Sequence, residues 1–148
     1  MSTASKGQKA KSAAHEVHLH RSMEERSFGK GTEVLGHGLA AAIAGATASL
    51  RLPQEAVDTV FCDINGERYP SHEWGMAVLR TPEVFATTAY ESPANLWGDM
   101  GAAWGALGCT LAVRAWARGY ARGPRALVWG SSDGGLRGAV VLQQLGRA

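Results

Sequence analysis

Alternating and continuous runs of apolar residues predict strands at both ends of the chain and in its middle. Residues 16–22 (EVHLHRS) alternate with a period of two, which is typical of a strand, with His18 and His20 on one face. Residues 57–63 and 83–92 are runs rich in Val, Phe and Thr that we also expect to be strands. Two apolar runs, at 125–132 and 137–144, are joined by a short glycine-rich link and predict a β-hairpin.

Helical patterns lie between these strands. Residues 32–50 are alanine-rich and place Leu35, Leu39 and Ile43 on one face. Ser71 is a suitable N-cap for a short helix that ends before Pro82, and a long apolar helix is expected within residues 92–123. The order β-α-β-α-β-α-β-β predicts an α/β fold, with a five-stranded mixed sheet covered by helices and the last two strands antiparallel.

The long helix is unusual because glycines recur along it. A glycine inside a helix costs about 1 kcal/mol relative to alanine, so repeated glycines call for a packing reason. A helix without a polar face is buried on every side, whereas a single sheet covers only one side of it. We therefore expect a second copy or a partner to cover it. The predicted interface consists of Gly98, Gly101, Ala102, Trp104, Gly105, Gly108 and Ala112.

The end of this helix is basic. Arg114, Arg118 and Arg122 are spaced to form one stripe, with Trp116 between the first two. One interpretation is a solvated face whose cations complement the helix C-terminus. The alternative is a docking site for an acidic partner, made by Arg114, Trp116 and Arg118.

Composition narrows the class of protein. The chain of 148 residues fits one domain, which we place at residues 15–146 after a basic, disordered tail at 1–14. A net charge of +2 gives no reason to expect nucleic acid, and no apolar run is long enough to span a membrane. Cys62 and Cys109 lie among apolar residues, which indicates buried thiols in a cytoplasmic protein. The histidines near the N-terminus lack a ligand partner, so we expect no metal and no cofactor.

Three motifs follow one another in the second part of the chain. They are DINGE at residues 63–67 after a predicted strand, GDMGAAWG at 98–105, and SSDGGLRGAVVL at 131–142 in the predicted hairpin. In this order they resemble the HGTGT, GHxxAAAG and FGFGGTNAHVIL motifs of the β-ketoacyl (3-oxoacyl-carrier-protein) synthases. The resemblance spans residues 28 to 144 and implies the C-terminal half of a thiolase fold.

The resemblance also implies a catalytically degenerate half. The two histidines of the family are replaced by Asp63 and Asp99, and a carboxylate does not donate the hydrogen bond that stabilises an oxyanion. The family's nucleophilic cysteine belongs to the N-terminal half, which has no counterpart here. We therefore expect a pseudoenzyme. Asp63 and Asp99 are either an acid pair that shares a proton or binds a cation, or two local caps.

These features favour a non-catalytic thiolase-like interaction module or adaptor. We expect it to work as a homodimer or with a partner that supplies the missing half. Short ketosynthase-like proteins of Gram-negative bacteria are encoded near effectors of type VI secretion, so the resemblance implies a secreted effector as one partner. The alternatives are the C-terminal subunit of a split ketosynthase-like enzyme and a non-catalytic binder of acyl groups or pantetheine.

Overall fold

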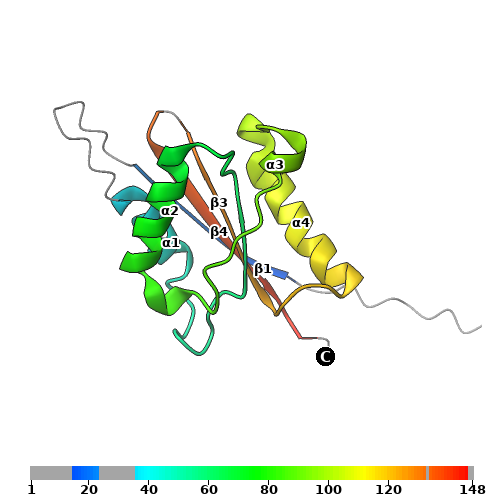
Figure 1. The fold of residues 1–148 in the computed structure, drawn as a ribbon. Helices are drawn as coiled ribbons and strands as arrows, with labels where there is room; N and C mark the ends of the chain where they lie inside the picture. The colour runs from blue at the N-terminus through cyan, green and yellow to red at the C-terminus, as the bar shows by residue number, and fades with distance from the viewer. Residues whose placement is uncertain (1–14, 24–35, 133, 147–148) are drawn as a thin grey trace, which may run out of the picture.

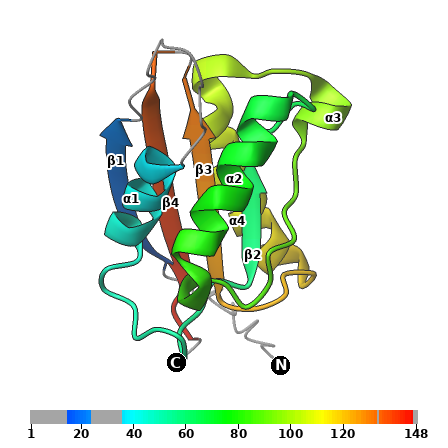
Figure 2. The same ribbon diagram turned by 60° about the vertical axis from the view of Figure 1, so that its left-hand side comes forward.

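The computed structural model describes residues 15–23, 36–132 and 134–146, and the predicted tail at 1–14 lies outside these ranges. The described chain folds into a mixed four-stranded sheet with helices on both faces, as Figures 1 and 2 show. The elements are β1 (His15–Met23), α1 (His37–Ala46), β2 (Thr59–Cys62), α2 (Arg68–Arg80), η1 (Pro82–Val84), α3 (Ala94–Trp97), η2 (Gly101–Ala103), α4 (Trp104–Arg118), β3 (Arg125–Ser131) and β4 (Leu136–Gln144).

The strands lie in the order β1-β4-β3-β2. The strands β2 and β3 are parallel, whereas β4 runs antiparallel to both of its neighbours. The predicted α/β class, the mixed sheet and the terminal hairpin are therefore confirmed, while the prediction of five strands is wrong.

The strand expected at residues 83–92 is not formed. This segment begins with the short helix η1, and its backbone forms two isolated bridges, Val57 with Phe85 and Phe61 with Glu91, in place of a continuous ladder. Between the bridges the Thr87 hydroxyl accepts a hydrogen bond from the amide of Ala89. Such a local turn competes with a continuous strand ladder.

The helix α2 begins earlier than predicted, at Arg68, so Ser71 lies inside it rather than at its N-cap. The Ser71 hydroxyl donates to the carbonyl of Glu67, one turn back. Pro70 is tolerated there because the first turn of a helix needs no amide donors. Glu73 follows in the same helix, and its side chain is completely buried.

The face covered by α1 and α2 holds most of the core. Gly45 of α1 sits directly against the His20 ring of β1, where a Cβ atom would come within 2.2 Å of the ring. Trp74 of α2 stacks on Trp129 of β3 at 5.6 Å between ring centroids. Completely buried on this face are Leu39, Ala42, Ile43, Val57, Cys62, Ala77, Leu127, Ala139 and Val141.

An ion pair lies buried on the same face. Arg137 of β4 and Glu73 of α2 are 1% and 0% exposed and form two hydrogen bonds, one of 3.1 Å from Nη2 to Oε2. Arg137 Nη1 also donates to the carbonyls of Ser132 and Leu136. A buried guanidinium needs this degree of pairing, because an isolated charge is costly to desolvate.

The opposite face is covered by α4 alone. This helix lies over β3 and β2, and a smaller cluster forms there from Phe61, Trp104, Ala112, Ala126, Val128 and Leu142. Gly108 lets the helix approach the sheet, since a Cβ atom on it would lie 2.5 Å from Val128 Cγ1. The helix leaves β1 largely open on this side.

Candidate docking surface on the α4 side

Most of the exposed large apolar side chains lie on the side of the sheet that carries α4, while Leu79 and Tyr90 are exposed on the other side. Those more than half exposed include Leu96 at 83%, Leu19 at 70%, Tyr120 at 65% and Trp97 at 53%. We call the surface formed by α3, α4 and the open part of β1 the α4-side surface. Its remaining exposed apolar residues include Val17, Met100, Val113 and Leu136. Contiguous apolar area on a protein surface is typical of interaction sites.

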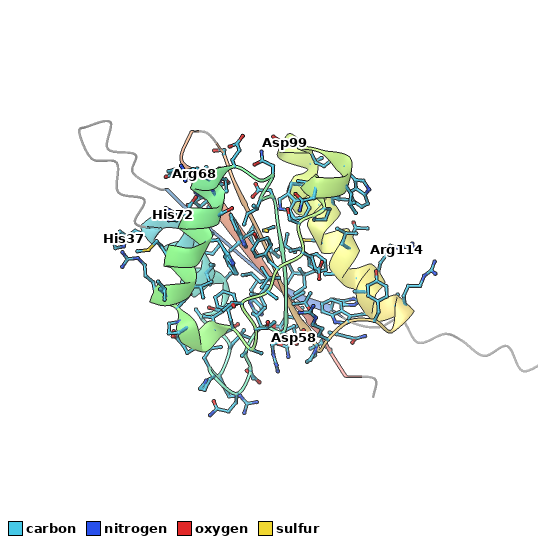
Figure 3. The ribbon with its side chains drawn as sticks, in the orientation of Figure 1. His37, Asp58, Arg68, His72, Asp99 and Arg114 are labelled. Atoms are coloured by element: carbon cyan, nitrogen blue, oxygen red, sulfur yellow. The ribbon has the colours of Figure 1, made fainter. Side chains whose placement is uncertain are left out.

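The start of α4 differs from the prediction. The helix begins at Trp104, after a loop in which Gly98 and Gly101 have φ values of 77° and 54°. These left-handed conformations favour glycine, so both residues serve the turn. Asp99 accepts a hydrogen bond from the amide of Gly101 at 2.8 Å and holds this loop, but it does not cap α4, whose N-cap is Ala103, so the interpretation of Asp99 as a helix cap is wrong. Figure 3 places Asp99 where α3 passes into α4.

The predicted interface residues divide into two groups. Trp104, Gly108 and Ala112 face the chain's own sheet and are buried, so they do not belong to an outer interface. Gly105 is exposed, and no atom lies within 4 Å of a Cβ placed on it. The exposed group consists of Gly98, Gly101, Ala102 and Gly105, together with Ala106 of the next position.

The three motifs of the sequence meet at one groove beside the start of α4. The Asp63 groove has a volume of about 260 Å³, and Asp63, Gly101, Gly105, Ser131 and Ser132 contribute to its lining. Trp104 closes it on one side, and its Nε1 donates to the carbonyl of Trp129 at 2.8 Å. Gly130 is required beside this ring, since a Cβ there would lie 2.9 Å from Trp104 Cδ1. Leu19 of β1 lines the opposite side.

Asp63 at the end of β2 accepts a hydrogen bond from the amide of Ser131, 2.9 Å away, and so ties β2 to β3. Burial raises the pKa of the Asp63 carboxyl above its usual range, and the negative charge of Asp99 raises it further. Hydrogen bonds to backbone amides act in the opposite direction. The two aspartates thus lie close enough to interact, as the order of the motifs predicts.

The groove offers little catalytic chemistry. Neither cysteine nor histidine contributes to its lining. Cys62 is buried in the core on the other face, and burial raises the pKa of its thiol to about 12. A thiol with that pKa is not a thiolate nucleophile at neutral pH. Both cysteines are free, as the sequence predicts.

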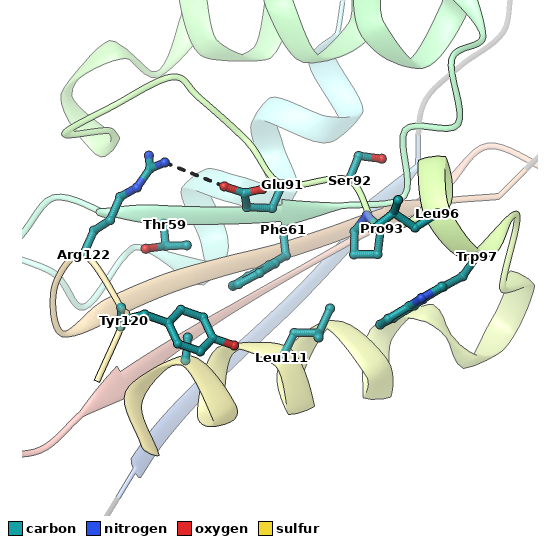
Figure 4. A pocket seen from close by; sticks show the side chains of 12 residues that line it. Thr59, Phe61, Glu91, Ser92, Pro93, Leu96, Trp97, Leu111, Tyr120 and Arg122 are labelled. Carbon is teal, nitrogen blue, oxygen red and sulfur yellow. Dashed lines mark ion pairs between the residues drawn. The ribbon is translucent and has the colours of Figure 1, made fainter. Parts of the chain in front are cut away.

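A second hollow lies on the other flank of α4, and Figure 4 shows it from close by. We call it the Phe61 pocket. Its volume is about 400 Å³, and Phe61 and Leu111 meet across it with Trp97 and Tyr120 at its two ends. Glu91 and Arg122 form an ion pair of 3.7 Å at its rim.

The basic end of α4 also differs from the prediction. The helix ends at Arg118, and Gly119 follows with a φ of 76°, so Arg122 lies beyond the helix and does not extend a stripe. Arg114 and Arg118 are exposed, and Figure 3 shows Arg114 pointing away from the sheet.

Trp116 is not the exposed docking residue that the sequence predicted. Its ring stacks on His15 with centroids 5.4 Å apart, and its Nε1 donates to the carbonyl of Gly123 at 2.7 Å. The exposed tryptophan of this side is Trp97, which follows the helix-breaking Pro93 by only a few residues and gave no periodic signal.

The histidines of β1 separate onto both faces of the sheet. His15 lies on the α4 side against Trp116, whereas the Nε2 atom of His18 lies 3.2 Å from Glu16 Oε1 and His20 packs on Gly45. Within the described ranges no group of three or more His, Cys, Asp or Glu side chains could hold a metal ion. Likewise, no helix in those ranges is long and apolar enough to cross a bilayer.

Comparison of the chain with known protein families, curated proteins and solved structures gave no match. The resemblance to β-ketoacyl synthases therefore stays a prediction that rests on the three motifs.

Proposed function

We propose that this protein is a non-catalytic interaction module that binds a protein partner through its α4-side surface. The observation that carries the proposal is the placement of the exposed apolar residues. Leu96, Trp97 and Val113 flank the exposed small residues of α4, and the sheet covers only the other side of that helix. A smooth, apolar helix face is suited to close packing against a second helix or sheet.

The chemistry of the Asp63 groove supports a non-catalytic role. The family that the motifs resemble needs a thiol nucleophile and histidine donors, whereas the groove is lined by the carboxyl of Asp63 and the hydroxyls of Ser131 and Ser132. The split-enzyme alternative requires a partner that brings both. A secreted effector, a second copy or a separate thiolase-like half each satisfies the need for a cover over α4.

A pair of matched helix glycines tests the proposal. Gly105 of α4 and Gly75 of α2 both have open space beyond them. We expect Gly105→Glu to abolish or weaken at least tenfold the binding of the partner that co-purifies with the tagged chain. Gly75→Glu is expected to retain binding. Equal binding by both variants, with unchanged circular dichroism, would contradict the use of α4.

The Phe61 pocket favours a second candidate, the binding of an acyl chain. Its lining is largely apolar, and Trp97 at its mouth provides a fluorescent reporter. A medium-chain acyl-CoA is expected to change the tryptophan emission of the wild-type chain, but not that of Leu111→Glu, which places a charge in the apolar lining. No change with the wild-type chain would exclude this candidate.

A further inference from the structure

The strand β1 forms a long, regular edge of the sheet. It pairs with β4 without interruption, from His15 opposite Gln144 to Met23 opposite Leu136. Among the described residues no segment pairs with its outer edge, whereas the other edge, at β2, carries bridges to Phe85 and Glu91. Figure 2 shows β1 at that margin of the sheet. An unprotected edge without proline or bulge is a template for another strand.

The side chains of β1 give this edge two different faces. Val17 and Leu19 point to the α4 side, opposite Leu142 and Val140 of β4, and are 59% and 70% exposed. Glu16 and His18 point to the α1 side. One face of the edge is thus apolar and the other carries a carboxylate beside imidazoles.

We propose that β1 pairs antiparallel with β1 of a second copy of this chain, which joins two four-stranded sheets into one. The twofold axis passes through His18. This register places Val17 opposite Leu19 of the second copy, and Glu16 opposite His20 of the second copy. An apolar pair and a carboxylate–imidazole pair then each occur twice, and His18 faces His18 of the second copy.

Neighbouring registers lack this double match. A twofold axis at Leu19 places Val17 opposite Arg21. An axis at Val17 retains a Glu16–His18 pair but places Leu19 opposite His15, so its apolar contact is reduced to Val17 opposite itself. A shift by a single residue is excluded because it would turn the covered and open faces of the two sheets to opposite sides.

The inference goes beyond the proposed function because it concerns the backbone edge of β1, whereas the proposed function concerns the exposed face of α4; the side chains of Val17 and Leu19 belong to both. It has a consequence for the groove, however. Leu19 lines the Asp63 groove, so pairing at β1 sets the two grooves of the dimer beside one shared apolar strip on the same face of the joined sheet.

Disulfide trapping tests the register. The background is Cys109→Ser, in which the remaining Cys62 is completely buried. In the full chain under mild oxidation, His18→Cys is expected to form a cross-linked dimer at least tenfold more than Glu83→Cys, an exposed position on η1. A mixture of differently tagged Val17→Cys and Leu19→Cys chains is expected to cross-link to each other more than either does to itself.

Light scattering tests whether the chain forms a dimer through β1. We expect a dimer for the wild-type chain and a monomer for the double variant Val17→Lys/Leu19→Lys, whose exposed positions leave the fold unchanged by circular dichroism. A monomeric wild-type chain at tens of micromolar overturns the inference. A dimer that survives the lysines but is lost in Gly105→Glu also overturns it, while leaving the proposed role of α4 intact.

Discussion

The two faces of the sheet differ in how far the chain covers them. On the α1 and α2 face the side chains of Leu39, Ile43 and Val57 are completely buried, and even a charged pair is enclosed. On the α4 face Leu19 and Leu96 remain mostly exposed. The chain places α1 and α2 over the first face and α4 alone over the second, and this difference in cover accounts for the difference in burial. The chain itself covers the α1 and α2 face, and we infer that the α4 face requires a partner to cover it.

The largest loss of stability is expected when the buried ion pair of the α1 and α2 face is broken. Glu73→Ala leaves the charge of Arg137 without its partner, and we expect a loss of about 3–5 kcal/mol in the free energy of unfolding. Urea titration measures it. The double variant Glu73→Leu/Arg137→Met, which removes both charges, is expected to lose less than Glu73→Ala does. A double variant as unstable as the single one would mean that packing, not charge, sets the cost.

Leucine truncations on the two faces give the next contrast. Leu39→Ala creates a cavity in the covered core and is expected to cost about 2–5 kcal/mol. Leu96→Ala on the α4-side surface removes an 83% exposed side chain and is expected to cost less than about 0.5 kcal/mol in the isolated chain. Chemical denaturation of both variants checks the difference, and equal costs would argue against the contrast between the faces.

Glycine substitutions separate close packing from open space. Gly108→Ala places a methyl group against Val128, and we expect a loss of about 1–3 kcal/mol. Gly75→Ala, at an exposed position inside α2, is expected to gain about 0.5–1 kcal/mol from better helix propensity. Thermal unfolding of the two variants reports both signs. A Gly108→Ala variant as stable as the wild type would show that α4 is free to move off the sheet.

The smallest effect is a pH dependence at Asp63. Burial raises the pKa of its carboxyl, so the folded chain holds this proton to higher pH than the unfolded chain, and ionisation costs stability as pH rises above 3.8. Asp63→Asn removes that cost and keeps an oxygen that accepts from Ser131. We expect the stability of the variant relative to wild type to increase between about pH 4 and pH 7. A constant difference in urea titrations would contradict this.

Sequence patterns predicted the fold best where the strand period or the chemistry of a turn defines an element. The alternation at 16–22 and the link between the last two runs located β1 and the terminal hairpin, because strand period and turn chemistry are local properties. Residues 83–92 have the composition of a strand, but Pro82 and the turn at Thr87 divide the segment. Amino-acid composition does not reveal that a local turn competes with the strand.

The site was predictable only in part. The order of the motifs brought Asp63 and Asp99 together, yet the glycines at 98 and 101 were assigned to a helix because sequence does not distinguish a helical glycine from one with positive φ. The pair of Glu73 and Arg137 joins residues 64 positions apart. The sequence held one sign of this pair: Arg137 lies two and four residues before the buried Ala139 and Val141, and so on the same face of β4.

The pairing of β1 with β4 joins the first described strand to the last. During synthesis β1 leaves the ribosome long before residues 136–144, so its inner edge stays unpaired until those residues have been made. A contact of this sequence separation slows folding, because the chain must close a loop that contains every other element. Nascent chains that end before residue 136 therefore expose both edges of β1 and are the forms most prone to aggregate.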